Sequence, residues 1–199
     1  MLLTNDDIFS IFRARRIVFE MLTMRSYTNI KGPNFTSAVQ FKKFIQDIDN
    51  ELCLSVTAEN LEQKKVIVFF FETDKIGINK IRILFSIIPK ETHCIFFFRK
   101  CFSHFARNEL PKHIESYEIF KEGSFINPLN HMYVPKHIRL SEEEKQKIIL
   151  KAGKKEYLPK IKKSDAVSKF LGFVVGDVIH IKRPTSEGYF TNLYRLVVE

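Results

Sequence analysis

The chain has 199 residues, of which 45% are hydrophobic, and it carries 20 phenylalanines and a net charge of +9. This length and apolar content suffice for one large or two small packed cores, so the composition predicts a folded protein. The longest apolar runs, 66–71 and 94–98, are far shorter than the roughly 20 residues that span a bilayer, and Asp6 and Asp7 interrupt any signal-peptide pattern. We therefore expect neither secretion nor a membrane partner.

The cysteines and histidines do not predict a metal site. Cys53, Cys94 and Cys101 form an odd set without close spacing, which is typical of reduced thiols. The pairs His93–Cys94 and Cys101–His104 supply the ligand types of zinc, but along a strand rising ~3.3 Å per residue they would lie roughly 20 Å apart. We expect no metal, cofactor or small-molecule substrate.

Two amphipathic helices are predicted at the start of the chain. Apolar residues recur at helical spacing over 7–25, and Thr4 or Asn5 can provide the N-cap. The Gly-Pro-Asn sequence at 32–34 interrupts the chain. A second helix, capped by Thr36 or Ser37, then follows, and its predicted buried face comprises Val39, Phe41, Phe44, Ile45 and Ile48.

A sheet of about four strands is predicted next, because four runs are rich in aromatic and β-branched residues: 52–57, 66–71, 94–99 and 114–120. The middle two are almost continuously apolar, which indicates burial on both faces and helices on both sides of the sheet. The spacing of apolar residues predicts a connecting helix over 78–88, ended by Pro89. The predicted fold is α/β, with a mixed sheet flanked by helices.

A second unit is predicted from residue 133, giving domains 1–132 and 133–199. Ser141 and Glu144 form a capping-box pattern before a helix that runs to about 152 and can end at Gly153. A short helix, capped by Ser164 or Asp165, should stop at Gly172. Strands at 174–182 and 189–198 would complete a small α+β module.

Positive charge is concentrated in this second unit. Between residues 136 and 163 there are ten Lys or Arg and four acids, an excess of +6. Such a run is usually a solvated face, and the alternative is a surface that docks on acidic protein or nucleic acid.

No catalytic constellation is evident. The sequence has no nucleophile elbow and no phosphate-binding glycine loop. A metal-dependent nuclease would need converging carboxylates and a lysine, types that Glu62 with Lys64, or Glu72 and Asp74 with Lys75, provide. The first pair falls in a polar loop, and an extended backbone would point Lys75 away from the other set, so surface acids near a turn are the better interpretation.

The segment after the third strand is a candidate nucleic-acid interface. Contact with phosphates requires accessible positive groups, and the turn after this strand provides Arg99, Lys100, Ser103 and, one turn on, Arg107. The alternative interpretation is ordinary solvated loop charge. The phenylalanine stripes fall on strands and inward helix faces, so they are predicted to be core rather than a base-stacking platform.

The last forty residues carry a specific order of motifs. In chain order these are Leu158-Pro159-Lys160-Ile161, Ser164 to Gly172, Gly176-Asp177-Val178, Ile181-Lys182-Arg183-Pro184 and Tyr194-Arg195-Leu196-Val197-Val198. Together they resemble the fifth subunit of eukaryotic nuclear RNA polymerases, whose archaeal homologue corresponds to the C-terminal module alone. Weaker similarity covers nearly all of the remaining chain, in the segments 12–16, 25–27, 66–70, 75–81, 127–131 and 134–137.

The resemblance implies a non-catalytic subunit of a DNA-directed RNA polymerase. In the family, this subunit is shared by polymerases I, II and III. Its N-terminal jaw domain would have a nuclease-like fold without nuclease activity and lie beside downstream duplex DNA, with Arg99, Lys100, Ser103 and Arg107 as sequence-independent contacts. Its C-terminal module would dock on the largest polymerase subunit and reach other core subunits. A nuclear location follows, or host cytoplasm or a virion if the source is a large DNA virus.

The residues that match the assembly module of the family are Leu158, Pro159, Ile161, Val167, Phe170, Gly172, Arg183, Pro184, Tyr194 and Arg195. Some of them must form the core of the module, and the sequence leaves open which ones contact a partner. Three features depart from the family pattern: Ala166 replaces Pro, Lys169-Phe170 replaces Arg-Tyr, and 186–192 has a different spacing. The alternatives to a polymerase subunit are a free-standing nucleic-acid-binding adaptor and, more remotely, the nuclease.

Overall fold

The computed structural model describes residues 4–46, 54–60, 64–71, 73–185 and 188–199. The chain divides into two compact units, Met1–Ile126 and Asn127–Glu199. The sequence placed this division after residue 132. The structure places it earlier because the short 3-10 helix η3 (Pro128–Asn130) packs on helix α6 (Ala166–Leu171) of the second unit.

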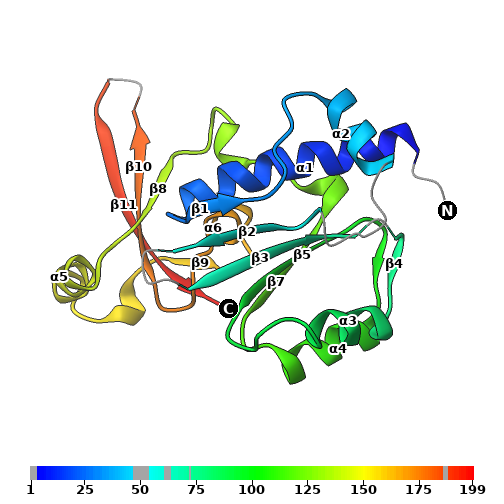
Figure 1. Ribbon diagram of the computed structural model, residues 1–199. Helices are drawn as coiled ribbons and strands as arrows, with labels where there is room; N and C mark the ends of the chain where they lie inside the picture. The colour runs from blue at the N-terminus through cyan, green and yellow to red at the C-terminus, as the bar shows by residue number, and fades with distance from the viewer. Residues whose placement is uncertain (1–3, 47–53, 61–63, 72, 186–187) are drawn as a thin grey trace. The chain divides into compact units, whose positions relative to one another are not determined.

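A five-stranded mixed sheet forms the centre of the first unit (Figure 1). β3, β5 and β7 are parallel to one another, whereas β1 and β2 join the edge as antiparallel strands. The prediction of an α/β fold with a mixed sheet is confirmed. In the order of the sheet, the strands are β1 (Thr28–Lys31), β2 (Val56–Glu59), β3 (Lys65–Phe70), β5 (His93–Phe98) and β7 (Tyr117–Lys121).

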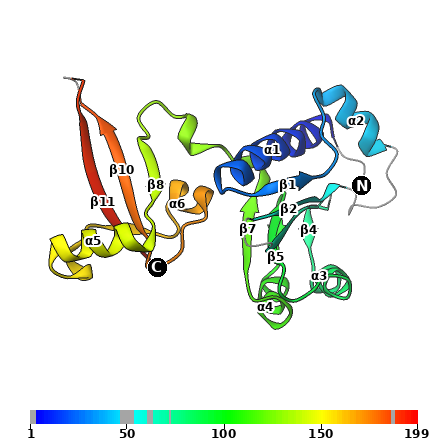
Figure 2. The ribbon, with the colours of Figure 1, turned by 60° about the vertical axis from the view of Figure 1, so that its left-hand side comes forward.

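Helices cover both faces of this sheet, as the apolar strands predicted (Figures 1 and 2). α1 (Asn5–Met24) and α2 (Ala38–Gln46) lie on one side, and α3 (Ile78–Phe85) and α4 (His104–His113) lie on the other. Thr4, one of the two predicted caps, forms a capping box with Asp7. In α2 the prediction is wrong for Val39, which is 67% exposed, and Ile48 lies outside the described residues.

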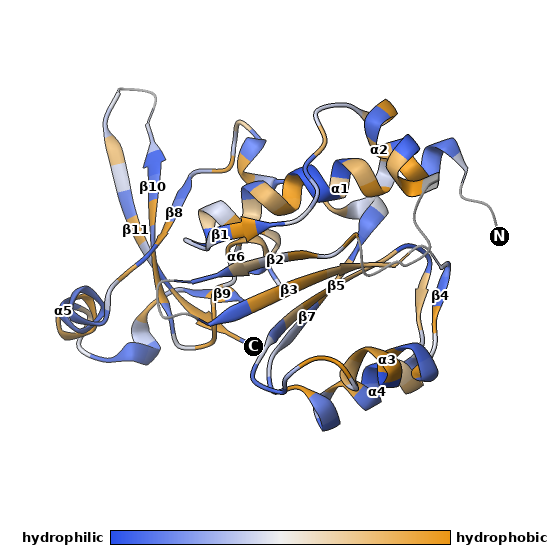
Figure 3. Ribbon diagram, in the orientation of Figure 1, coloured by the Kyte–Doolittle hydropathy of each residue, from blue (hydrophilic) through white to orange (hydrophobic). Residues whose placement is uncertain are grey.

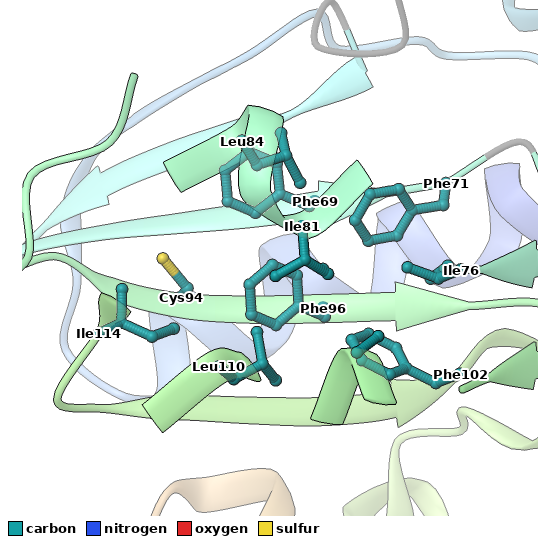
Figure 4. Packing of buried hydrophobic residues seen from close by; sticks show 11 residues of the cluster. Phe69, Phe71, Ile76, Ile81, Leu84, Cys94, Phe96, Phe102, Leu110 and Ile114 are labelled. Carbon is teal, nitrogen blue, oxygen red and sulfur yellow. The ribbon is translucent and has the colours of Figure 1, made fainter. Parts of the chain in front are cut away.

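Stacked phenylalanines build the core between the sheet and the α3–α4 layer (Figure 4). The Phe96 ring of β5 lies 5.5 Å from the Phe69 ring of β3 and 6.2 Å from the Phe71 ring. Ile81 and Leu110 close this cluster from the two helices. The hydropathy colouring in Figure 3 shows the apolar character along β3 and β5, and the predicted role of the phenylalanine runs as core is confirmed.

Several elements of the first unit differ from the prediction. α3 ends at Phe85, before Pro89, because the Ser86 hydroxyl donates to the Ile83 carbonyl and the chain turns there. The predicted strand 52–57 begins outside the described residues and is seen as β2. β1, α4, the 3-10 helix η2 (Glu122–Ser124) and a two-stranded parallel sheet of β4 (Lys75–Ile76) and β6 (Cys101–Phe102) were not predicted.

The second unit contains a four-stranded sheet in the order β8, β10, β11, β9. β8 (Lys136–Arg139), β10 (Val178–Pro184) and β11 (Phe190–Val198) are antiparallel neighbours (Figure 2), and β9 (Lys160–Lys162) runs parallel to β11. The short strands β8 and β9 were not predicted. The 3-10 helix η4 (Lys155–Tyr157) precedes β9.

One helix packs on each face of this second sheet. α5 (Glu142–Ala152) contributes Ile148 and Ile149 to a cluster with Val178 and Leu196. α6 contributes Leu171 to the opposite cluster, whose buried members are Ile161, Phe173, Ile179, Ile181 and Val197. The expected α+β module is therefore present, with two small cores that share one sheet.

The helix ends of the second unit are confirmed almost residue by residue. Ser141 and Glu144 form the capping box of α5, and Gly153 ends it with φ at 85°. Asp165 caps α6, and Gly172 ends it in the left-handed region at φ 67°, ψ 35°. β10 begins later than predicted because a turn precedes it. Among the described residues, no helix is both long and apolar enough to cross a membrane.

Candidate assembly and nucleic-acid surfaces

The residues matched to the assembly module separate into a buried and an exposed group. Leu158, Ile161, Val167 and Phe170 are between 2% and 8% exposed, and Leu158 and Ile161 belong to the two core clusters of the second unit. Tyr194 is half-buried and stacks on the His180 ring at 4.9 Å. Exposed positions are Pro159, Arg183, Pro184 and Arg195.

A hollow of about 310 Å³ lies beside the exposed arginines. It is bounded by β10 and β11, the start of α6 and the segment 133–135. Alternation along β10 places Ile179, Ile181 and Arg183 on one face of the sheet. α6 covers this face near Ile179 and leaves it open near Arg183, so the hollow has an apolar floor and a cationic rim.

A third arginine, Arg139, lies outside the hollow and holds the edge of the sheet face that α6 covers, called the α6 face below. Arg139 of β8 forms an ion pair with Asp177 at 3.0 Å and donates to the Gly172 carbonyl oxygen at 2.5 Å. Its guanidinium also lies 5.5 Å from the centre of the Phe173 ring. Arg139 therefore ties the end of α6 to β8 and to the turn before β10, a positioning role that the sequence did not single out.

In the first unit, the candidate nucleic-acid residues lie after β5. Arg99 is 12% exposed at its side chain and forms ion pairs with Asp7 (3.2 Å) and Asp74 (2.7 Å). Lys100 also contacts Asp74, at 2.7 Å, but it is 64% exposed. Of these two cations, Lys100 has the more accessible charge.

Ser103 and Arg107 belong to the start of α4. Ser103 is the N-cap residue, and its hydroxyl accepts the backbone N–H of Ala106 at 3.2 Å. Arg107 is exposed, and its guanidinium lies 5.7 Å from the centre of the Phe102 ring. The structure thus brings Lys100 and Arg107 to one end of the first unit, near β6.

The pairing of β4 with β6 adds a residue that was not assigned to this surface. Lys75 is exposed and is the register partner of Cys101, so the backbone brings it beside Lys100. The sequence showed Lys75 only as a nuclease candidate, because two-residue strands carry no periodic signal. Lys75, Lys100 and Arg107 are called the jaw cations below.

A buried acid accompanies this charge network. The Glu122 side chain, which follows β7, is fully buried, and neither of its carboxylate oxygens has a hydrogen-bond partner among the described residues. Burial raises the pKa of Glu122 to about 7, and the charge of Arg99 opposes that shift. Sequence reasoning missed Glu122, because nothing in its local pattern distinguishes it from a surface acid.

Asp74 and His93, which were considered as nuclease and zinc residues, contact other side chains. Asp74 is already neutralised by Arg99 and Lys100, which lower its pKa, chiefly through the Lys100 hydrogen bond. Glu62 and Glu72 lie outside the described residues. His93 begins β5, where its two ring nitrogens contact Ser116 and Glu118.

Cys94 and Cys101 have different environments. Cys94 is buried in the α3–α4 core, where desolvation raises its thiol pKa to about 12, whereas Cys101 is exposed on β6. Cys53 lies outside the described residues. No cluster of three metal-ligating side chains occurs in the described parts of the chain.

Comparison with known proteins identifies the family. Sequence models named "RNA polymerase Rpb5, N-terminal domain" and "RNA polymerase Rpb5, C-terminal domain" match residues 5–88 and 126–197. The chain is 28% identical to "DNA-directed RNA polymerases I, II, and III subunit rpabc1" of Dictyostelium discoideum, over 97% of this chain and 100% of that protein. The corresponding Caenorhabditis elegans subunit is 27% identical over 98% of this chain and 100% of its own length.

An archaeal relative matches about a third of the chain. "DNA-directed RNA polymerase subunit Rpo5" of Methanosarcina acetivorans is 47% identical over 72 residues, which are 36% of this chain and 92% of that protein. These matches define the class of the protein as a subunit of a DNA-directed RNA polymerase, which acts in transcription. The chain belongs to the Rpb5 family.

Proposed function

We propose that this chain is a non-catalytic polymerase subunit that docks on the largest subunit through its second unit and lies beside downstream DNA through its first. The observations that carry the docking role are the C-terminal family model, which matches residues 126–197, and the 72-residue match to 92% of an archaeal subunit. We infer that both matches fall on the second unit, which then holds the part of the function that the two lineages share. We expect the chain to act in the nucleus, where eukaryotic polymerases act. For a viral source, we expect it in the host cytoplasm or in a virion.

The residues proposed for docking are the exposed members of the matched set: Pro159, Arg183, Pro184 and Arg195. The buried members act indirectly, because Leu158 and Ile161 pack in the two cores that the sheet shares with α5 and α6, and Val167 and Phe170 are buried residues of α6. Gly172 ends α6, and Tyr194 packs on the α5 side. This division supports an interface made by the open part of the α6 face.

The proposed DNA-facing surface consists of the jaw cations, with Ser103 at the N-terminus of α4 as a further phosphate contact. Lys100 and Arg107 present accessible charge, whereas Arg99 is proposed to act by positioning Asp74 and Lys100 through its ion pairs. Such contacts are electrostatic and do not read base sequence. A nuclease-like jaw without nuclease chemistry is the corresponding proposal for the first unit.

Affinity purification of the tagged chain from its native source, followed by mass spectrometry, tests the assembly role. We expect the two largest polymerase subunits to be recovered at moderate salt. Recovery of subunit sets from more than one polymerase would establish a shared subunit. Recovery of the chain alone, or with nucleic acid only, would contradict the proposal and favour a free-standing adaptor.

A further inference from the structure

The hollow of the second unit carries more positive than negative charge. Arg183, Arg195 and Asp165 line it, which leaves an excess of one positive charge, with His137 as an additional polar group. The Asp165 carboxylate is engaged at the start of α6, where one oxygen accepts the backbone N–H groups of Val167 (2.9 Å) and Ser168 (3.3 Å). Its charge is therefore partly satisfied by the helix rather than by the arginines.

The two arginines remain available to a ligand. Arg183 is exposed, and neither arginine forms an ion pair with any other residue that the structure describes. Arg195 donates one long bond, of 3.3 Å, to the Lys160 carbonyl oxygen, which leaves most of its donors unused. A carboxylate matches the forked donors of a guanidinium in charge and geometry.

The walls of the hollow favour protein over nucleic acid. Its floor includes Ile161, Val167 and Ile181, and the exposed side chains of Tyr133 and Leu193 stand at its margin. A phosphate backbone makes little use of an apolar floor. Tyrosine and arginine around a small apolar centre are instead typical of residues that dominate protein interfaces.

We propose that the hollow binds an acidic side chain, Asp or Glu, that projects from an apolar segment of the polymerase subunit on which this chain docks. The carboxylate would lie between the guanidinium groups of Arg183 and Arg195, and its apolar neighbours would cover Leu193 and Tyr133. This inference rests on the proposed docking function and adds the chemistry of the docking segment.

Charge reversal on the two faces of the same sheet tests this inference. Arg183→Glu with Arg195→Glu reverses the rim of the hollow. Lys136→Glu with Lys182→Glu is the matched control, because these lysines are register partners on the opposite face and make the same change in net charge. At moderate salt, we expect the first pair to lower recovery of the largest subunit by about tenfold or more, and the control pair by less than about twofold.

A single conservative variant makes the contact directly visible. Arg183→Lys keeps the positive charge and supplies an amine that a zero-length carbodiimide reagent can join to a neighbouring carboxylate. In the assembled polymerase, we expect a cross-link from residue 183 to an Asp or Glu of the large subunit, flanked by apolar residues. A cross-link only to acids within this chain would overturn the inference.

The outcomes separate the inference from the function on which it rests. If the wild-type chain recovers no polymerase, docking itself fails and the inference falls with it. If the wild type assembles but the two reversed pairs behave alike, docking stands and the acidic segment is refuted. Loss of duplex binding with intact assembly in the Arg183→Glu and Arg195→Glu variant would assign the hollow to nucleic acid instead. Thermal unfolding of each variant checks that its second unit is folded. If the variant with Arg183→Glu and Arg195→Glu is not folded, Arg183→Gln takes its place in the recovery experiment.

Discussion

At the scale of single residues, Ser26 has a backbone conformation that is unfavourable for serine. Ser26 follows α1 with φ at 62°, in the left-handed region that costs a residue with a Cβ about 1–2 kcal/mol. The turn closes the end of α1, because the backbone N–H of Tyr27 donates a hydrogen bond to the Leu22 carbonyl oxygen.

Ser26→Gly should therefore stabilise the protein by about 1 kcal/mol, since glycine adopts positive φ without the steric cost. Urea denaturation of the full chain measures this change. The same substitution at Ser10, inside α1, is the control and should destabilise by about 0.5 kcal/mol through lower helix propensity. A loss of stability in both variants would show that the Ser26 turn is not strained.

Glu122 makes the stability of the protein depend on pH. Its pKa is raised by burial to about 7, above the usual value of 4.5, so the folded state binds the proton more tightly than the unfolded state. The free energy of unfolding therefore falls as the pH rises from about 4.5 to 7. The loss is complete above pH 7 and amounts to at most about 3 kcal/mol. Glu122→Gln removes the titrating group.

We expect Glu122→Gln to be more stable than the wild type at pH 8 and similar to it at pH 5. Denaturant unfolding of both proteins at these two pH values measures the difference, and subtraction cancels the histidines that both share. An equal pH dependence in the two proteins would show that Glu122 does not titrate in this range.

At the scale of elements, the helix ends were the most predictable features. Capping uses residues within one turn of each other, so Ser141 with Glu144, Asp165 and Gly172 could be assigned from local sequence. β4, β6, β8 and β9 could not, because strands of two to four residues are stabilised by partners distant in the chain. α4 was missed because it is mostly polar and contains Pro111.

Gly172→Ala tests the end of α6. The left-handed conformation at φ 67° should make alanine cost about 1–2 kcal/mol, and the contact of Arg139 with the Gly172 carbonyl opposes a shift of the backbone. Gly123→Ala is the control, since a Cβ there meets no atom within 4 Å and the backbone is not at positive φ. Thermal or urea unfolding compares the two. Equal effects would mean that the conformation of Gly172 is not required.

At the scale of the whole molecule, the exposed cations of the first unit are unevenly distributed. The jaw cations gather at one end of the first unit, beyond the carboxyl end of β5, whereas Lys65 and Lys90 lie toward the amino ends of β3 and β5. Parallel strands thus place residues distant in sequence at one edge of the sheet. This arrangement gives the proposed DNA contact a matched control within the same unit.

Lys100→Ala with Arg107→Ala should weaken retention of downstream DNA by the assembled polymerase and lower the salt dependence of binding by up to about two counterions. Subunit recovery should be unchanged, because both side chains are exposed. Binding to a fluorescent duplex at several salt concentrations measures the effect. Lys65→Ala with Lys90→Ala should leave binding unaltered, and an equal loss there would show that only net charge matters.

The sequence by itself determined the α/β character, the two-unit organisation, the helix caps and the family, because periodicity, capping residues and ordered motifs are local patterns. The tertiary structure decided which matched residues are core and which are exposed, and it brought Arg183 and Arg195 to one hollow. It also placed Arg99 between Asp7 and Asp74 and buried Glu122. The physical reason is that burial and charge pairing depend on contacts between residues far apart in the chain, which no local pattern specifies.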